Sequence, residues 1–543
     1  MVVRRGLGFG GTLVAVLFFC AALTPSLLPR TWQMQGVIGG ITAALGYAVG
    51  ATLAAALPAR WQVRNRRAAW QLLIAMCAPL TAAALLYSIG WQRDLRRLMG
   101  MDTAISWSAP VILIVAAAVF AALLLFARTI RLGGRKLVHW LDRFIPVPVA
   151  HALGVLIVAA LVAVFANSVL FNGFINVMND ISSVTNRTTA TGIRRPVSPH
   201  VSGGPGSLVP WHSLGKEGRS FVATASGREE LAAFAGPGVT VAEPIRVYVG
   251  LHSSTSPREQ AALAVRELER TGAFGRPVLA VLGTTGTGWV DPAIADSLEL
   301  MYRGDSAVVA LQYSYLPSWV SFLVDRGKAA ATGAALIEAV RARYATLPAD
   351  GRPRLLVSGE SLGSYELEGA FEDLADLLAE VDGAMLVGPP DANPIWQEVT
   401  AAREPGSPVW RPVYQDGRTV RFAQYPADLR ARPGRLRVVY LQNASDPVVW
   451  WSPTLVYDKP EWLTGERGPD VNDQMNWFPL VTFWQVLGDL PGAITVPAGH
   501  GHHYGAIIAD GWAAIAAPPG WTAADTTRLG SYLATSSATH STW

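Results

Sequence analysis

The chain has 543 residues. This length is too great for one ordinary domain and predicts two to four domains. Its hydrophobic content of 51% is unevenly distributed, because nearly all of the long apolar runs lie before residue 173. The formal net charge of +4 reflects arginines beside those runs, and no RNA- or DNA-binding motif is present, so we predict no nucleic-acid partner.

Five apolar runs in the first third of the chain are long enough to cross a bilayer, which takes about 20 residues of helix. They cover approximately Leu7–Leu28, Gly36–Leu57, Leu72–Gly90, Ala109–Ala127 and Ala150–Phe171. Arg4 and Arg5 before the first run are typical of a signal peptide, but no convincing small-residue cleavage site follows. We therefore predict a bundle of about five transmembrane helices over residues 1–172.

Basic residues gather in alternate connections between these runs, and positive charge is retained on the cytoplasmic side of a membrane. The basic connections hold Arg4 and Arg5, then Arg60, Arg64, Arg66 and Arg67, and then Arg128, Arg131, Arg135, Lys136 and Arg143. The N-terminus is therefore predicted to be cytoplasmic. Five spans then place everything after Phe171 on the extracytoplasmic side, and one span more or fewer would reverse this prediction.

Two later segments lack the periodicity of regular structure. Residues 173–217 are rich in Gly, Pro, Ser and Thr and predict an irregular connector. Residues 526–543 are rich in Ser and Thr and predict a flexible tail. The intervening residues 218–525 are predicted to form one soluble domain.

Within that domain, short β-branched runs alternate with helical patterns, which is typical of βαβ units and a mainly parallel sheet. The predicted strands are Ile245–Leu251, Pro277–Leu282, Ala307–Tyr313, Arg354–Val357, Ala384–Val387, Arg437–Leu441 and Ala493–Val496. The predicted helices include Pro257–Thr271, Asp325–Tyr344 and Leu362–Leu378.

A nucleophile motif lies between the fourth predicted strand and the helix that follows it. Gly359-Glu360-Ser361-Leu362-Gly363 fits G-x-S-x-G, in which the serine occupies a strained turn and the glycines leave room for neighbouring backbone. The helix N-terminus favours a developing anion. This context predicts that Ser361 is a nucleophile rather than a structural turn residue.

A serine nucleophile needs a base and an acid, which follow it in the chain on loops after strands. Asp446 follows the strand Arg437–Leu441 and is favoured as the acid, while Asp391, also behind a strand, is the rival. His500 is favoured as the base, with His502 close behind and one expected to orient the other.

Other roles for these segments are less well supported. Histidines 500, 502 and 503 lack the nearby Cys or H-E-x-x-H pattern of a metal site. Cys20 and Cys77, the only cysteines, lie inside apolar runs and cannot build a thiolate site or a disulfide framework. We predict neither a metal nor a cofactor.

An oxyanion hole requires two donors, usually the N–H after the nucleophile and one from the loop after the third strand. Leu362 supplies the first. The loop Gly283–Trp289 is predicted to supply the second, from Thr284 or Thr285. Its glycines resemble a phosphate cradle, but no G-K-[ST] follows.

With this site, the chain resembles a bacterial family of integral-membrane α/β-hydrolases. The resemblance covers most of residues 1–520 and rests on Arg246–Leu251, Thr285–Trp289, Gln312–Trp319, the Ser361 turn, Ser445–Asp446–Pro447 through Trp451, and Gly499–His502. It implies an α-helical transmembrane bundle followed by an α/β-hydrolase domain, a mainly parallel sheet with helices on both faces. Ser361, Asp446 and His500 or His502 fill the positions of a serine-hydrolase triad.

The expected function is that of a membrane-anchored serine hydrolase of the esterase or lipase type, acting through an acyl-Ser361 intermediate. The expected partners are the lipid bilayer and a lipid or envelope-associated ester. The alternatives are an acyltransferase with the same triad and a non-catalytic scaffold or transport component. Five aromatic residues are expected to line a pocket that suits an acyl chain, to face the bilayer interface or to pack in the core: Tyr313, Tyr315, Trp319, Trp450 and Trp451.

Overall fold

A computed structural model describes residues 7–56, 66–104, 108–146, 171–430 and 433–540, with residues 153, 156, 157 and 160. The chain divides into two compact units. Unit 1 comprises Met1–Val177 and Trp451–Gly492, and unit 2 comprises Met178–Trp450 and Ala493–Trp543. The segment Trp451–Gly492, here called the inserted segment, was predicted to belong to the soluble domain. It packs instead with the apolar helices of unit 1.

Unit 1 contains the apolar helices α1 (Phe9–Ala22), α2 (Trp32–Ala56), α3 (Arg66–Leu98) and α4 (Ala109–Leu141). Among the described residues, α2, α4 and Arg67–Leu98 of α3 are long and apolar enough to cross a membrane, which indicates membrane association. The first predicted span forms α1, which has 14 residues and is shorter than a crossing helix. The fifth predicted span, Ala150–Phe171, lies almost entirely outside the described residues.

Helices α1, α2 and α4 pack closely because glycines of α2 face both neighbours. A Cβ on Gly46 would lie 2.7 Å from the carbonyl oxygen of Val14 in α1. A Cβ on Gly40 would lie 2.7 Å from the carbonyl oxygen of Ala116 in α4. Small residues allow such backbone approach between apolar helices, where packing rather than the hydrophobic effect drives association.

A buried ion pair joins the connection between α1 and α2 to helix α17 (Val481–Asp489) of the inserted segment. Nε of Arg30 donates to Oδ1 of Asp489 over 2.7 Å, with side-chain exposures of 2% and 0%. Other guanidinium nitrogens donate to Gln35 and to the carbonyl oxygen of Gln485, while Oδ2 of Asp489 accepts from the Ser26 hydroxyl. Arg30 thus fastens the inserted segment to the connection between α1 and α2 within unit 1.

Unit 2 is built on a seven-stranded sheet in the order β1-β3-β2-β4-β5-β7-β6, with every neighbouring pair parallel. The strands are β1 (Ile245–Val249), β2 (Val278–Gly283), β3 (Ala307–Leu311), β4 (Arg354–Glu360), β5 (Gly383–Val387), β6 (Val420–Ala423) and β7 (Val438–Leu441). These strands are buried almost without interruption, as expected for a sheet covered on both faces.

Two predictions about the sheet were wrong. Ala493–Val496 forms turns and not a strand, because Ile494 is exposed and the place beside β7 is taken by β6. β6 was not predicted, since its four residues carry a buried arginine, Arg421, and do not read as a continuous apolar run.

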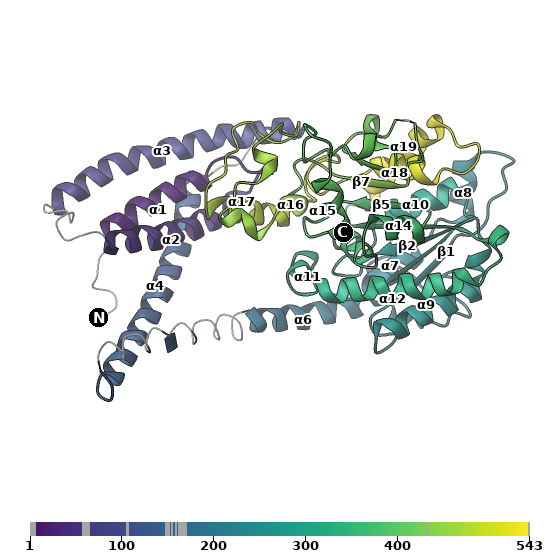
Figure 1. Cartoon of the computed structure of the whole chain (residues 1–543), viewed down its shortest axis with the longest axis horizontal. Coiled ribbons are helices and arrows are strands. Elements are labelled where there is room, and N and C mark those ends of the chain that lie inside the picture. The colour runs from purple at the N-terminus through teal and green to yellow at the C-terminus, as the bar shows by residue number, and fades with distance from the viewer. Residues whose placement is uncertain are drawn as a thin grey trace. The chain divides into compact units, whose positions relative to one another are not determined.

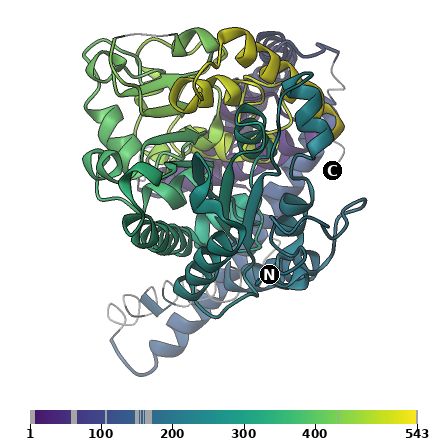
Figure 2. The same cartoon turned by 90° about the vertical axis from the view of Figure 1, so that its right-hand side faces the viewer.

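Helices cover both faces of the sheet (Figure 1, Figure 2). Helices α9 (Pro257–Thr271) and α12 (Arg326–Ala345) pack together and against β1, β2 and β3, while α18 (Ile507–Ala516) packs on β5, β7 and α10 (Pro292–Met301). The remaining helices are α7 (Gly215–Ala223), α8 (Arg228–Ala235), α11 (Ser318–Val324), α13 (Leu362–Glu368), α14 (Leu374–Glu380), α15 (Pro394–Ala401) and α16 (Pro447–Trp450). The single helix predicted over Leu362–Leu378 is broken, because Asp373 caps a new helix at Leu374.

The predicted connector and tail contain more regular structure than their composition suggested. Helix α6 (Asn172–Arg187) covers the start of the region 173–217, and helix α7 begins near its end, at Gly215. Helix α19 (Ala523–His540) occupies most of 526–543, and Leu529 and Leu533 on one face of it are buried. Because these two leucines are four residues apart, they lie on one face of α19, and burying that face stabilises a helix whose other residues are mostly polar.

Candidate active site

Ser361 occupies a strained turn between β4 and α13 at the centre of the sheet. Its φ of +55° and ψ of −125° lie outside the regions that residues other than glycine ordinarily adopt. The turn is held by a hydrogen bond from the Ser361 N–H to the Val387 carbonyl oxygen at 2.8 Å and by the Ser364 hydroxyl, which donates to the Ser361 carbonyl oxygen. The backbone around Ser361 is therefore fixed from both sides.

Glycines make the turn possible. A Cβ on Gly363 would lie 2.5 Å from the Gly283 carbonyl oxygen, and one on Gly359 would meet the backbone of Gly363. Gly283 ends β2, so the loop after β2 passes directly against the turn. This is the close backbone approach that the G-x-S-x-G spacing predicted.

Asp446 and His502 meet at the carboxyl ends of β7 and β5. Nδ1 of His502 and Oδ2 of Asp446 are 2.6 Å apart, and both side chains are buried. His502 also packs against Gly388, the residue after β5, where a Cβ would collide with the imidazole. The structure thus brings His502, and not His500, to Asp446.

The loop that carries His502 is fastened to the loop that carries Asp446. The Asn443 side-chain amide donates to the Gly501 carbonyl oxygen at 2.9 Å, and the Gly501 N–H donates to the Ser445 hydroxyl at 2.8 Å. The Tyr504 hydroxyl donates to Oδ2 of Asp446 at 2.7 Å. Burial, followed by the nearby Asp446 carboxylate, raises the pKa of Tyr504 well above its usual value, so the phenol remains a donor.

The contacts described for the other predicted candidates are with other residues. His500 forms a backbone bridge with His503, and Nδ1 of His503 contacts the Val496 carbonyl oxygen at 2.8 Å. Asp391 follows β5, and its carbonyl oxygen accepts from the Gln397 side chain. The described geometry pairs Asp446 with His502, whereas the sequence analysis placed His500 ahead of His502.

Two carboxyl groups that the sequence analysis did not single out adjoin His502. Oε1 of Glu360, the residue before Ser361, lies 3.6 Å from Nε2 of His502. Glu360 forms a side-chain hydrogen bond with Asp291 in the segment between β2 and α10. The sequence did contain a signal for Glu360, because it is an ionisable residue at the second position of the motif, where a buried strand ends.

Nε2 of His502 has no hydrogen-bond partner among the described residues, and no hydrogen bond joins it to the Ser361 hydroxyl. Catalytic hydrogen bonds are often loose without substrate and tighten in the complex.

The predicted oxyanion donors differ in their availability. The Leu362 N–H starts α13 and makes no hydrogen bond among the described residues. The Thr284 N–H instead donates to Oε2 of Glu366 at 2.8 Å, and the Thr285 N–H donates to the Trp289 carbonyl oxygen at 2.9 Å. Both backbone groups proposed for the second donor are thus engaged within the protein.

The aromatic residues proposed to line an acyl pocket are mostly core residues. Tyr313 and Trp450 are buried in unit 2, where the Trp450 indole donates to the Ala444 carbonyl oxygen. Trp451 is buried in unit 1 beside Phe483. Trp319 is different, because 45% of it is exposed on α11, a helix whose Ser321 packs against Gly286 in the loop after β2.

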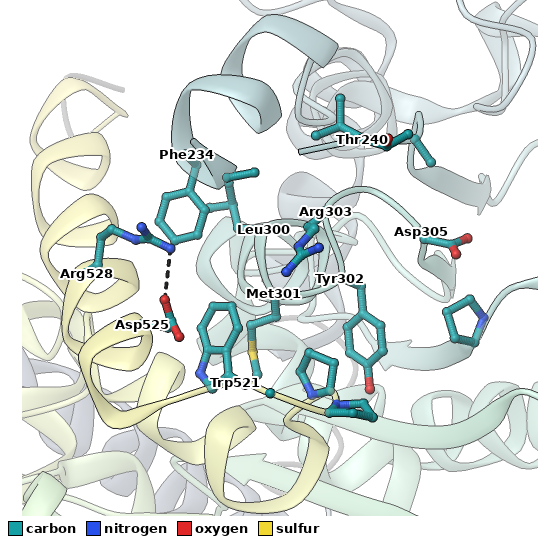
Figure 3. Close-up of a pocket in the computed structure, with 17 residues that line it drawn as sticks. Phe234, Thr240, Leu300, Met301, Tyr302, Arg303, Asp305, Trp521, Asp525 and Arg528 are labelled. Carbon is teal, nitrogen blue, oxygen red and sulfur yellow. Dashed lines mark hydrogen bonds and ion pairs between the residues drawn. The ribbon is translucent and has the colours of Figure 1, made fainter. Parts of the chain in front are cut away.

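A separate cavity of about 420 Å³ opens at the amino ends of the strands (Figure 3). It is lined by segments that precede β1, β2 and β3 and by residues of the α18–α19 region, including Tyr302, Trp521 and the Asp525–Arg528 ion pair. Ser361 follows the carboxyl end of β4, so this cavity lies at the opposite edge of the parallel sheet. It is not part of the candidate site.

No group of three His, Cys, Asp or Glu side chains is arranged to hold a metal ion within the part of the chain that the structure describes.

The fold and this site define a hydrolase of the α/β type, and comparison with protein families agrees. Residues 245–529 match the alpha/beta-hydrolase family, and residues 23–225 match the N-terminal region of an alpha/beta-hydrolase family. The chain belongs to the alpha/beta-hydrolase family. Comparison with curated proteins and with solved structures gave no match.

Proposed function

We propose that the protein is a membrane-anchored serine hydrolase in which Ser361, His502 and Asp446 form the catalytic triad. The observation that carries the proposal is the 2.6 Å contact between His502 and Asp446, at the edge of the sheet where Ser361 occupies its strained turn. Such a turn is maintained only where the surroundings over-determine it, and in this fold it directs the serine side chain to the carboxyl end of the sheet.

In the proposed reaction, the Ser361 hydroxyl attacks an ester carbonyl while Nε2 of His502 takes its proton. Asp446 holds Nδ1 of the imidazole and stabilises the imidazolium. The proton then passes to the leaving alcohol, and water repeats the sequence to release the acid from acyl-Ser361. The Leu362 N–H, which has no internal partner, is the first oxyanion donor.

The second oxyanion donor is proposed to be the hydroxyl of Thr285. Its N–H is already engaged with Trp289, as that of Thr284 is with Glu366, but the Thr285 hydroxyl makes no hydrogen bond among the described residues. The close approach of Gly283 to Gly363 keeps this loop against the nucleophile turn.

Fluorophosphonate labelling of the purified full-length protein tests the proposal. Wild type is expected to be labelled at one serine and Ser361→Ala to be unlabelled, because the reagent requires an activated hydroxyl. Ser364→Ala is a partial control, since it keeps Ser361 but loses one support of the turn. Labelling of Ser361→Ala at the wild-type rate would contradict the assignment.

The substrate is proposed to be an ester with an apolar acyl chain, supplied by a lipid or by an envelope component. Trp319 and Leu323 of α11 are exposed apolar side chains on the helix that packs against the loop after β2. Three apolar helices of membrane-crossing length support a location at the bilayer, which raises the effective concentration of lipid for an attached domain.

Activity on p-nitrophenyl esters is expected to rise from acetate toward longer acyl chains and to rise further with detergent-dispersed lipid. Trp319→Ala is expected to reduce this preference for longer chains by about 10-fold, because about one large apolar contact is lost. A steady decline from acetate to long chains, with no gain at a lipid surface, would rule out the apolar substrate.

The orientation proposed from the sequence has the N-terminus in the cytoplasm and unit 2 outside. Its basis is the alternation of basic connections between the apolar runs. A phosphatase reporter fused after Phe171 is active only outside the cytoplasmic membrane and therefore checks this side directly.

A further inference from the structure

Glu360 and Asp291 form a buried carboxyl pair beside the candidate triad. Glu360 ends β4 and immediately precedes Ser361, and only 7% of it is exposed. Asp291 caps the N-terminus of α10, where its Oδ1 accepts from the Ala293 N–H at 2.8 Å. The two side chains are hydrogen-bonded to each other. A second acidic side chain, that of Asp291, thus lies beside the residue that precedes the nucleophile.

The ionisable groups around the pair come from the loop after β7 and from the loop that carries His502. Oε1 of Glu360 lies 3.6 Å from Nε2 of His502. The Asp446 carboxylate acts electrostatically on Glu360, Glu360 acts on Tyr504, and His503 and His502 act on Asp291. Three carboxyl groups therefore surround one imidazole, and they cannot all be ionised without strong mutual repulsion.

The two carboxyl groups of the pair differ in their tendency to hold a proton. Burial, and then the neighbouring Asp291, raise the pKa of Glu360 well above its usual value. Burial also raises the pKa of Asp291, but the hydrogen bond from Glu360 and the Ala293 N–H oppose this shift. Of the two groups, Glu360 therefore has the stronger tendency to hold a proton, and its Oε1 faces His502.

We propose that Glu360 is a positioning residue for the base: buried beside Asp291, its carboxyl group presents Oε1 to Nε2 of His502 at 3.6 Å. This inference rests on the proposed serine-hydrolase function. An ionised Glu360 would place His502 between two carboxylates, stabilise the imidazolium and remove the lone pair that must accept the Ser361 proton. Burial and the neighbouring Asp291 oppose this ionisation, because both raise the pKa of Glu360.

The test is the pH dependence of fluorophosphonate labelling in three full-length variants. In Asp291→Asn, the new amide donates to Glu360 and favours its ionised form. The acid limb of the labelling rate is then expected to move up by about one pH unit, a loss of about 10-fold on that limb. Asparagine is as good a helix N-cap as aspartate, so α10 keeps its cap in this variant.

The double variant Asp291→Asn/Glu360→Gln distinguishes a protonation effect from damage to the fold. Glutamine at 360 is neutral and cannot ionise, so the acid limb is expected to return to the wild-type position. Glu360→Gln alone is expected to keep that position as well. An acid limb that stays displaced in the double variant, or that never moves in Asp291→Asn, would overturn the inference.

An infrared measurement separates failure of this inference from failure of the proposed function. The spectrum of Glu360→Gln is subtracted from that of the full-length wild type, because other buried carboxyl groups with raised pKa values, such as Glu366, contribute to both spectra and cancel. The difference is expected to contain the carbonyl band of a protonated buried carboxyl. If wild type is not labelled at all, the serine-hydrolase proposal fails, and the role of Glu360 fails with it. If wild type is labelled but the difference spectrum lacks this band, only the role of Glu360 fails.

Discussion

Asp446→Asn is expected to lower turnover of an activated ester by about 10³- to 10⁴-fold while the protein remains folded. Asp446 accepts three hydrogen bonds, from Nδ1 of His502, from the Tyr504 hydroxyl and from the Val448 N–H. Asparagine has nearly the same shape, but its amide cannot hold the imidazole in the tautomer that leaves Nε2 free to accept a proton. The measurement is kcat/KM with a p-nitrophenyl ester.

Asp391→Asn is the matched control, because Asp391 is the other acidic residue that follows a strand of the sheet. It is expected to change kcat/KM by less than about threefold. His502→Ala should resemble Asp446→Asn, since residues of one triad act as a unit and their losses do not add. Equal losses in Asp391→Asn and Asp446→Asn would mean that the acid was assigned incorrectly.

Asp489→Ala is expected to destabilise unit 1 by about 3–5 kcal/mol, because it leaves the guanidinium of Arg30 buried without its charge partner. Asp489 also accepts the hydroxyl of Ser26 and the N–H of Leu27. The change should appear as a lower Tm of the full-length protein in detergent, and as earlier proteolysis within the inserted segment.

Asp94→Ala provides the control, since the Arg97–Asp94 pair has side-chain exposures of 69% and 41% and exposed pairs contribute about 0–1 kcal/mol. The double variant Arg30→Met/Asp489→Leu is expected to recover much of the lost stability, because an apolar pair needs no desolvated charge to be matched. A Tm of Asp489→Ala within the range of Asp94→Ala would show that the pair does not hold the inserted segment in place.

The sequence by itself determined the features that depend on neighbours in the chain. Short β-branched runs between helical patterns predicted six of the seven strands, and the start of α9 at Pro257 was also predicted. The motif around Ser361 predicted the strained turn, because it places the serine between a strand and a helix, with a glycine two residues away on either side. Each of these signals is local, so no knowledge of distant contacts was needed.

Only the tertiary structure decided which distant side chains meet. His500 and His502 are two residues apart and both follow Asp446, so spacing cannot separate them, and the hydrogen bonds of Gly501 to the loop of Asn443 and Ser445 put His502 on Asp446. The pairing of Glu360 with Asp291 depends on the order of strands in the sheet. The ion pair between Arg30 and Asp489 joins residues 459 positions apart. At that separation nothing in the sequence distinguishes Arg30 from other arginines in loops, so only the folded chain shows that it is paired.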